Sequence, residues 1–398
     1  MINSDPIIRE HISALGNGYF MLSDAESALI ELKSSYEGNF SMIYMDPPGA
    51  INASNYITCE ACGKQRSFEA FHDISLAEYK AMLKAVLIAC HPLLCESGCV
   101  FLHTTQMQTH HARLILDEVF GADCFLNEII WTYKAGGRSS KRFSSRHDSI
   151  LFYCKSPTNH YFSTKDIGIK RGSKPHNHRK RSISDDGRVY FTALANGRAY
   201  RYYEDSTIIP SDVWDDIDAV GVKSAESIGY PQQKPSALLK RILLCSTKKD
   251  DLVLDLFSGS GTFAALASTL DRRWVAVDNS PAALMTIRNR LLQQSSGILQ
   301  CNGSVTLKYN TPMEPFELPN IEVILNEDML SVVIERTCLD IPLRYAALCN
   351  LSSDNTLTPL SSSFCSTMPT RLPFVNIPEH PVVQLVYADF SQALIPLK

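Results

Sequence analysis

The chain has 398 residues, a formal net charge of −4 and twelve cysteines. Its apolar and charged fractions, 45% and 20%, are ordinary for a globular protein, and no apolar run is long enough to span a bilayer, which argues against a membrane protein. The start of the chain lacks the basic and apolar segments of a secretory signal, so we expect a cytoplasmic protein with reduced cysteines.

Strands and helices alternate through the first part of the chain. Short apolar runs predict the strands, and apolar residues at helical spacing predict the helices between them. The expected strands cover residues 20–22, 40–45, 99–103, 128–133 and 149–154, and the expected helices cover 25–33, 77–94 and 107–120. This alternation is typical of an open α/β sheet.

A basic segment follows, in which the periodicity weakens. From Trp131 to Tyr203 there are sixteen Lys or Arg residues and four Asp or Glu residues, so the rest of the chain is acidic. Such a local excess of positive charge indicates a site for a polyanion such as DNA, and a solvated basic loop is the alternative. The candidate DNA-binding residues are Arg138, Lys141, Arg142, Arg146, Lys170, Arg171, Lys174, Arg179, Lys180 and Arg181.

A second α/β unit comes after the basic segment. Helical spacing covers 236–246, an apolar strand from Leu252 leads into a glycine-rich turn, and a strand over 273–277 ends at Asp278 before a helix over 282–292. After Gly297 the composition shifts to Ser, Thr, Pro and isolated apolar pairs, which predicts a small β-rich appendage.

The glycine-rich turn is a candidate cofactor site. Gly259 and Gly261 allow the backbone to approach a ligand closely. Asp278, about twenty residues further on, can accept hydrogen bonds from both hydroxyls of a ribose. The G-x-G-T spacing differs from the G-x-G-x-x-G of dinucleotide-binding folds, but an NAD-linked enzyme stays open as an alternative.

A carboxylate, Asp46, follows the expected strand over 40–45 and precedes two prolines and Gly49. The prolines restrict the backbone around that carboxylate, so its direction is fixed. A turn that simply ends the strand is the structural alternative.

Three segments in this order resemble the motifs of the beta-class DNA amino-methyltransferases, which have a permuted motif order. The segments are Asp46-Pro47-Pro48, Gly229-Tyr230-Pro231-Gln232-Gln233-Lys234-Pro235 and Phe257-Ser258-Gly259-Ser260-Gly261. The resemblance runs from about Tyr19 to Leu292 and includes residues 127–131, 136–139 and 212–217. These look like stretches of the modification subunits of type III restriction systems and their solitary relatives.

The resemblance implies a Rossmann-like sheet of seven strands, circularly permuted, that binds S-adenosyl-L-methionine. It implies an enzyme that methylates the exocyclic N6 of adenine in double-stranded DNA, with cytosine N4 as the alternative. In that family the aspartate and the first proline carbonyl accept the hydrogens of an amine on a flipped base. The implied catalytic residues are Asp46, Pro47, Pro48 and Gly49. The implied cofactor-binding residues are Asp24, Tyr230, Gln233, Lys234, Pro235, Asp255, Phe257, Ser258, Gly259, Gly261, Thr262 and Asp278.

One position departs from the family. Gly49 stands where the family has Tyr, Phe or Trp, whose ring stacks on the flipped base and is worth about 1–3 kcal/mol. Tyr56, Phe68 or Trp131 could substitute for that ring. Without a substitute, the chain would be a DNA-binding subunit that has lost turnover.

The resemblance also implies a division of the chain. The expected parts are a catalytic half over 1–133, a target-recognition region over 134–228 with a strand at about 149–154 returning to the core sheet, a cofactor-binding half over 229–297 and the appendage over 298–398. A homodimer or a separate restriction subunit stays open as a partner, since no nuclease or ATPase motif is present. Cys59 and Cys62 look like half of a zinc knuckle without a second pair, so no metal is expected.

Overall fold

The structure is a computed structural model. It describes residues 7–14, 17–48, 56–58, 65–67, 75–134, 140–170, 181–221, 223–230, 232–296, 303–310, 320–325, 330–336, 343–364, 370–374, 379–387 and 392–397. In this described part no helix has the length and apolar character needed to cross a membrane.

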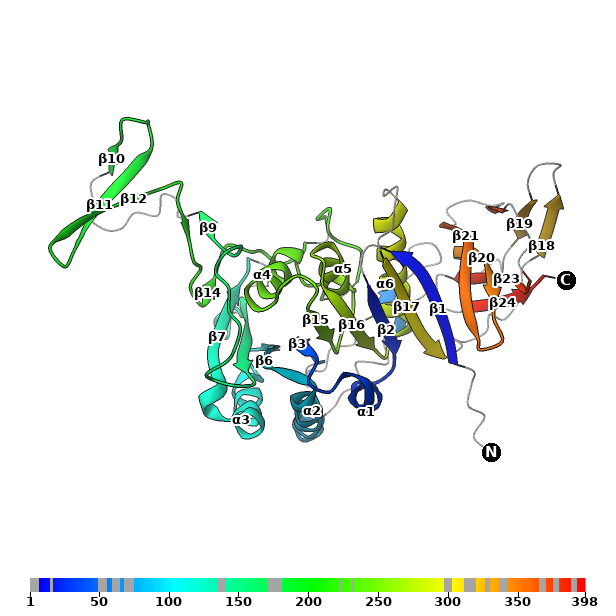
Figure 1. Ribbon diagram of the computed structural model, residues 1–398, viewed down its shortest axis with the longest axis horizontal. Coiled ribbons are helices and arrows are strands. Elements are labelled where there is room, and N and C mark those ends of the chain that lie inside the picture. The colour runs from blue at the N-terminus through cyan, green and yellow to red at the C-terminus, as the bar shows by residue number, and fades with distance from the viewer. Residues whose placement is uncertain are drawn as a thin grey trace.

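A mixed sheet of fourteen strands runs through the molecule (Figure 1). The strands, in spatial order, are β14 (Val213–Trp214), β7 (Phe125–Thr132), β8 (His147–Cys154), β6 (Leu94–Thr105), β3 (Phe40–Met45), β15 (Leu252–Asp255), β16 (Arg273–Asp278), β2 (Gly18–Leu22), β17 (Gly303–Asn310), β1 (Ile7–Ala14), β21 (Thr356–Phe364), β20 (Leu343–Leu351), β23 (Pro381–Tyr387) and β24 (Gln392–Pro396). Strands β6, β3, β15, β16 and β2 are parallel to one another, and β8 is antiparallel to β6 and β7.

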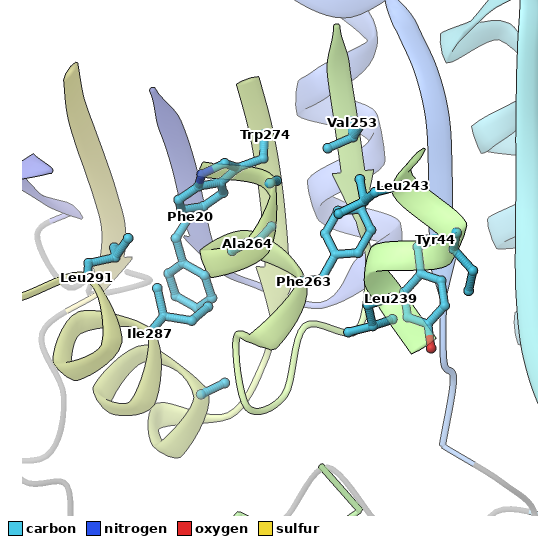
Figure 2. Packing of buried hydrophobic residues seen from close by; sticks show 14 of the residues in the cluster. Phe20, Tyr44, Leu239, Leu243, Val253, Phe263, Ala264, Trp274, Ile287 and Leu291 are labelled. Carbon is cyan, nitrogen blue, oxygen red and sulfur yellow. The ribbon is translucent and has the colours of Figure 1, made fainter. Parts of the chain in front are cut away.

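Helices cover both faces of the first part of this sheet (Figure 1). One face carries α4 (Ser236–Ser246), α5 (Thr262–Thr269) and α6 (Pro281–Ser296), and the other carries α1 (Ala25–Tyr36), α2 (Leu76–Cys90) and α3 (Thr109–Phe120). Each face buries its own apolar cluster. In the first, Phe20 and Trp274 of the sheet pack near Ile287 of α6, and Phe263 of α5 stacks on Tyr44 (Figure 2). The helices are therefore held by their apolar faces, as amphipathic spacing predicts.

The sheet is larger than the seven strands expected from the resemblance. The β-rich C-terminal region adds most of the difference, because β17 pairs in parallel with β2 and antiparallel with β1, and β21 then pairs with β1. An edge strand offers unpaired backbone donors and acceptors, so further strands can extend it. The appendage thus continues the sheet that carries the site.

A buried polar network fastens this extension to the helices. Arg288 of α6 donates to both carboxylate oxygens of Glu10 in β1, at 3.1 and 2.6 Å. Tyr309 of β17 and Gln384 of β23 each donate to the same Glu10 oxygen at 3.0 Å. The ion-paired side chains are only 1% and 0% exposed, so four elements depend on one desolvated contact.

The remaining elements are short. Two turns of 3₁₀-helix cover His91–Leu93 (η2) and Ala122–Cys124 (η3). Small separate sheets consist of β10 (Arg181–Ile183), β11 (Val189–Ala195) and β12 (Arg198–Tyr203); β13 (Thr207–Ile208) and β9 (Ile169–Lys170); β18 (Asn320–Leu325), β19 (Leu330–Arg336) and β22 (Thr370–Phe374); and β4 (Tyr56–Thr58) and β5 (Gln65–Ser67).

Candidate active site

The two diagnostic segments lie side by side because their strands are neighbours. β3 and β15 are parallel, with Ile43 opposite Leu254 and Tyr44 opposite Asp255. Asp46 follows β3, and the glycine-rich turn follows β15, so both leave the sheet at the carboxyl edge. Ligand sites of open α/β sheets form at this edge.

A cavity of about 360 Å³ opens between these segments. Asp46 and Gly259 both line it, although they are far apart in the sequence. The implied site residues along its wall are Asp24, Asp46, Pro48, Tyr230, Lys234, Asp255, Phe257, Ser258, Gly259, Thr262 and Asp278. The motif spacing did not single out several other lining residues, namely Ser23, Ala25, Glu26, Tyr44, Glu78, Met82, Val86, Leu239, Phe263 and Asn279.

The glycine turn needs both of its glycines for a geometric reason. Gly259 and Gly261 have φ angles of 45° and 69°, in the left-handed region that favours glycine. A Cβ on Gly261 would lie 2.4 Å from Cγ1 of Ile287, and a Cβ on Gly259 would lie 3.1 Å from the ring of Tyr230. Gly259 therefore forms the cavity wall, and Gly261 supports it from behind, where α6 packs.

Asp278 is held by the turn. Its two carboxylate oxygens accept hydrogen bonds of 2.8 Å from the backbone N–H groups of Gly259 and Ser280. Burial raises the pKa of Asp278 to about 6, and the two backbone hydrogen bonds limit that rise. Each oxygen keeps a further lone pair, so the ionised group can accept from the hydroxyls of a ribose.

This pKa gives the cofactor site a pH dependence. Because the pKa of Asp278 is about 6, we expect S-adenosylmethionine to bind about tenfold more weakly at about pH 5 than at about pH 8. Protonation removes the charge that strengthens hydrogen bonds from the ribose. Isothermal titration calorimetry across this range checks the expectation. An affinity that stays constant through pH 6 would contradict this role for Asp278.

Two further groups fit a bound nucleoside. The hydroxyl of Ser258 is buried on the cavity wall and has no hydrogen-bond partner among the described residues. A buried polar atom without a partner is unfavourable, so a ligand that supplies one is stabilised there. Asp255 is buried nearby, and burial raises its pKa well above the usual range. The cavity can therefore hold S-adenosylmethionine with Asp278 and Ser258 as its polar contacts.

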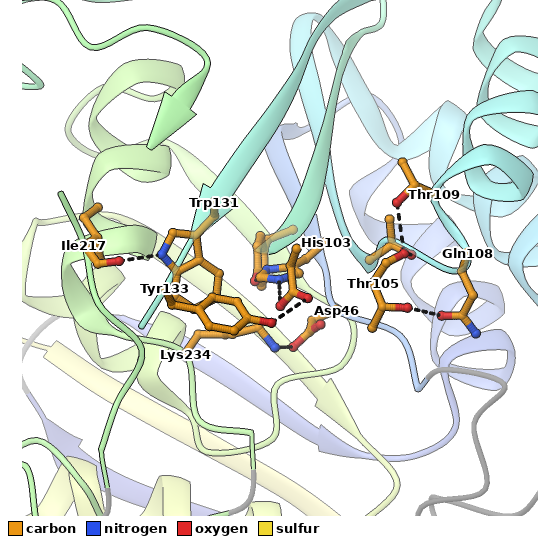
Figure 3. Close-up of polar contacts among 12 residues, drawn as sticks. Asp46, His103, Thr105, Gln108, Thr109, Trp131, Tyr133, Ile217 and Lys234 are labelled. Atoms are coloured by element: carbon orange, nitrogen blue, oxygen red, sulfur yellow. Dashed lines mark hydrogen bonds and ion pairs between the residues drawn. The ribbon is translucent and has the colours of Figure 1, made fainter. Parts of the chain in front are cut away.

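Asp46 forms an ion pair with Lys234, which follows the basic segment (Figure 3). The Lys234 ammonium donates to Oδ2 of Asp46, and the two side chains are 13% and 25% exposed. The resemblance implies that Lys234 contacts the cofactor. In this structure Lys234 also forms an ion pair with Asp46, which the resemblance implies to be catalytic. The pairing fixes one oxygen and leaves Oδ1 as an acceptor for an incoming amine.

A polar network that the motifs do not reveal lies beside Asp46 (Figure 3). The hydroxyl of Tyr44 is 3.2 Å from Nδ1 of His103, and Nε2 of His103 is 3.1 Å from Asp148. Tyr133 donates to the other oxygen of Asp148 at 3.2 Å. Burial raises the pKa of Tyr44 far above its usual value, so the phenol stays protonated and can donate to His103.

The charge of Asp148 belongs to the same network. Burial opposes ionisation of this group, but hydrogen bonds from His103 and Tyr133, together with the positive charge of Lys234, outweigh burial and lower the pKa of Asp148. An ionised Asp148 orients His103 and, through it, Tyr44, which lines the cavity. Because its members lie in β3, β6 and β8 and directly after β7, only the folded sheet brings them together.

Some implied site residues act as supports. Asp24 caps α1 by accepting a 2.8 Å hydrogen bond from the Ser27 N–H, and it also lines the cavity. Gln233 braces its own loop, with bonds to the Glu226 carbonyl at 2.7 Å and the Ile228 N–H at 3.1 Å. Pro235 is the residue before α4 and is buried. Gln233, Pro235, Pro47 and Gly261 do not belong to the lining of the cavity.

Of the three aromatic residues that could replace a ring at position 49, the structure describes the side chain of Trp131 only. Trp131 is buried, and its indole nitrogen donates to the Ile217 carbonyl at 2.7 Å, so its ring is a packing element (Figure 3). Gly49, Phe68 and the side chain of Tyr56 lie outside the described residues.

The candidate DNA-binding residues are only partly described. Lys141, Arg142 and Arg146 lie on the surface between β7 and β8. Arg181 is engaged with both carboxylate oxygens of Glu204, each at 2.6 Å. Arg138, Arg171, Lys174, Arg179, Lys180 and the side chain of Lys170 lie outside the described residues, as do Cys59 and Cys62. The part of the chain that is described has no cluster of three metal-ligating side chains.

A family model for DNA methylases, the N6 and N4 methyltransferases, matches residues 40–289. The match covers more than half of the chain and includes Asp46, the Lys234 segment and the glycine turn. The chain therefore belongs to this family of DNA amino-methyltransferases, and its cofactor is S-adenosyl-L-methionine.

Individual relatives agree with the family. The chain is 26% identical over 319 residues to the type II methyltransferase M.EcaI of Enterobacter cloacae, covering 68% of each chain. It is 26% identical over 277 residues to the DNA adenine methyltransferase YhdJ of Escherichia coli K12, covering 66% of this chain and 79% of YhdJ. The solved M1.HpyAVI–SAM complex superposes with a TM-score of 0.42 at 16% identity, covering 69% of this chain and 98% of that one.

Proposed function

We propose that this protein transfers a methyl group from S-adenosyl-L-methionine to the exocyclic N6 of adenine in duplex DNA at a specific sequence. The observation that carries the proposal is the shared cavity, which Asp46, the glycine turn and Asp278 line together. A cofactor held by Asp278 and Ser258 would present its sulfonium methyl group toward the carboxylate.

Asp46 would act by positioning the target amine, and not as an acid or base. The nitrogen of an exocyclic amine is a poor nucleophile, because its lone pair is delocalised into the base. Oδ1 of Asp46 and the Pro47 carbonyl would accept the two amine hydrogens and favour a tetrahedral nitrogen as it attacks. Lys234 keeps the carboxylate in place through Oδ2. The target nucleotide must leave the base stack to reach this point.

Adenine is favoured over cytosine for two reasons. Within the family, an aspartate rather than a serine before the two prolines is typical of adenine enzymes, and this chain has Asp46. One of its relatives, YhdJ, is named a DNA adenine methyltransferase. Cytosine N4 is the alternative target.

A second function is favoured by Gly49, which removes the stacking ring. Loss of about 1–3 kcal/mol of stacking weakens capture of the flipped base by about 5- to 150-fold. The protein would then be a DNA-binding subunit with the methyltransferase fold and little turnover. We place it second, because Asp46 and the turn that would hold the cofactor line the same cavity.

One experiment separates these functions. The protein is produced in cells that lack other DNA methyltransferases, and their DNA is read by long-read sequencing for N6-methyladenine and N4-methylcytosine. Methyladenine at one sequence context supports the proposal, and methylcytosine identifies the alternative base. Unmodified DNA together with tight DNA binding by the purified protein identifies the subunit without turnover.

The division of the chain also belongs to the proposal. We propose that residues 1–133 and 229–297 form the two halves of a permuted methyltransferase domain, that 134–228 reads the target, and that 298–398 supports the sheet. We further propose that the protein acts in the cytoplasm as part of a restriction–modification system. Restriction would then require another protein.

A further inference from the structure

An arm projects from the edge of the molecule near β14 (Figure 1). We define the arm as residues 181–205, which contain β10, β11 and β12. These strands form their own antiparallel sheet, and the described part of the chain adds no other strand to it. An element that projects in this way contributes little to the hydrophobic core. Its residues are therefore available to bind a partner molecule.

The arm has a narrow tip. Ala195 pairs with Arg198 across a two-residue turn made by Asn196 and Gly197. Their φ angles, 50° and 73°, are the left-handed values that a tight hairpin turn requires. The tip is therefore a two-stranded ribbon.

The root of the arm is electrically neutralised. Arg181 donates to both oxygens of Glu204 at 2.6 Å, and Arg188 donates to both oxygens of Asp205 at 2.7 and 2.8 Å. The guanidinium of Arg188 also lies 4.1 Å from the ring centre of Tyr203. These bidentate contacts link β10 and the turn before β11 to the residues that follow β12.

The tip, in contrast, is positively charged. No acidic residue occurs between Val189 and Tyr203, whereas Arg198 and Arg201 both lie there and are exposed. Among the described residues, neither arginine has an ion-paired carboxylate. The arm has four arginines and four acidic residues, but the acids all lie at its root. This separation directs positive charge outward.

Apolar side chains accompany that charge. Leu194 is 80% exposed and Tyr200 is 44% exposed, one on each face of the ribbon near the tip. The pattern of arginines with an exposed ring and an aliphatic chain is typical of a surface that meets both phosphates and bases.

We propose that the tip of the arm enters a groove of the duplex beside the base to be methylated. Arg198 and Arg201 would contact phosphates, and Leu194 and Tyr200 would contact sugars and base edges. The major groove is wide enough for a two-stranded β-ribbon. This inference rests on the proposed function, because it takes duplex DNA as the substrate.

The arm is tied to the catalytic pocket through the sheet. The chain leaves the arm through β13 and β14, and Trp214 of β14 pairs with Trp131 of β7. The ring of Trp131 meets that of His103 edge-on, with centroids 5.7 Å apart, and His103 belongs to the network beside Asp46. A groove contact by the arm would therefore set where the pocket lies along the duplex.

The test measures DNA binding by the full-length protein with Arg198→Ala/Arg201→Ala. The probe is an unmethylated duplex that contains the sequence found by long-read sequencing, or random-sequence duplex if none is found. We expect Kd to weaken about tenfold at moderate salt, and the slope of log Kd against log salt to fall by about 1–2. Footprinting should lose protection on one side of the target only.

The matched control is Lys33→Ala/Lys80→Ala, which removes the same charge from exposed positions on α1 and α2. Equal weakening of binding by both double variants would show a general charge effect and overturn the proposal. So would unchanged DNA binding with altered sedimentation, which would make the tip a protein interface. These readouts do not need turnover, so a protein without methyl transfer would refute the proposed activity and still test the arm.

Discussion

Asp46→Ala should abolish methyl transfer, by about a thousandfold or more, while cofactor binding is retained. Removing one preorganised hydrogen-bonding group from a reaction centre costs about a hundred- to a thousandfold in rate, and this change also leaves Lys234 without its partner. Asp46 is not part of the Asp278 and Ser258 contacts, so the affinity for S-adenosylmethionine should change little. Transfer of a tritiated methyl group to unmethylated DNA, measured beside calorimetry, checks both expectations.

Two variants calibrate this result. Asp46→Asn keeps a carbonyl acceptor and should retain more activity than the alanine variant. Asp123→Ala removes an exposed carboxylate in η3, away from the cavity lining, and should behave as the unmodified protein does. If the alanine variant at position 46 transfers methyl groups at an unchanged rate, the site we describe does not carry the reaction.

Glu10→Ala should lower the free energy of unfolding by about 3–5 kcal/mol. The change leaves the Arg288 guanidinium buried without its carboxylate, and Tyr309 and Gln384 lose the same acceptor. Because these residues come from different elements, the loss should also make unfolding less cooperative. Urea denaturation followed by circular dichroism and by tryptophan fluorescence measures the stability and tests whether both transitions coincide.

An exposed ion pair serves as the control for the stability loss expected of Glu10→Ala. Glu118→Ala removes the partner of Lys84, whose side chain is 44% exposed, and should cost less than about 1 kcal/mol. The variant Glu10→Met/Arg288→Met should recover part of the loss, because no buried charge then lacks a partner. Equal, small losses for Glu10→Ala and Glu118→Ala would show that the buried network does not fasten the sheet.

Much of the first part of the fold could be predicted from local pattern. The strand over 40–45 coincides with β3, and the helix over 236–246 coincides with α4, because apolar period and flanking breakers agree there. The helix expected over 77–94 ends at Cys90, where a 3₁₀ turn containing Pro92 follows. Cys154 and Cys245 are buried, as their apolar neighbours predict.

The size of the sheet could not be predicted in this way. β1 is paired by β17 and β21, which come about three hundred residues later. Neither the alternation of apolar and polar residues in β17 and β21 nor their composition shows which sheet edge these strands join. Pairing partners at such separation depend on the assembled shape of the sheet, and no local rule encodes them.

The site residues also differ in whether local sequence predicts them. Asp46, Gly259 and Asp278 could be predicted because each stands at a strand end with a characteristic neighbour. The network of Tyr44, His103, Asp148 and Tyr133 was missed, because its members lie in three strands and directly after a fourth. The only local signal was His103, a titratable residue that closes an otherwise apolar strand.

The place of β1 has a consequence for how the protein is made. This strand is synthesised before the other described strands, yet both of its neighbours in the sheet come from beyond residue 300. During translation β1 therefore stays without its sheet neighbours while the helices and strands around the cavity are synthesised. It can pair only after residues 303–310 and 356–364 have been made. During that interval its unpaired backbone donors and acceptors are open to pairing with other chains.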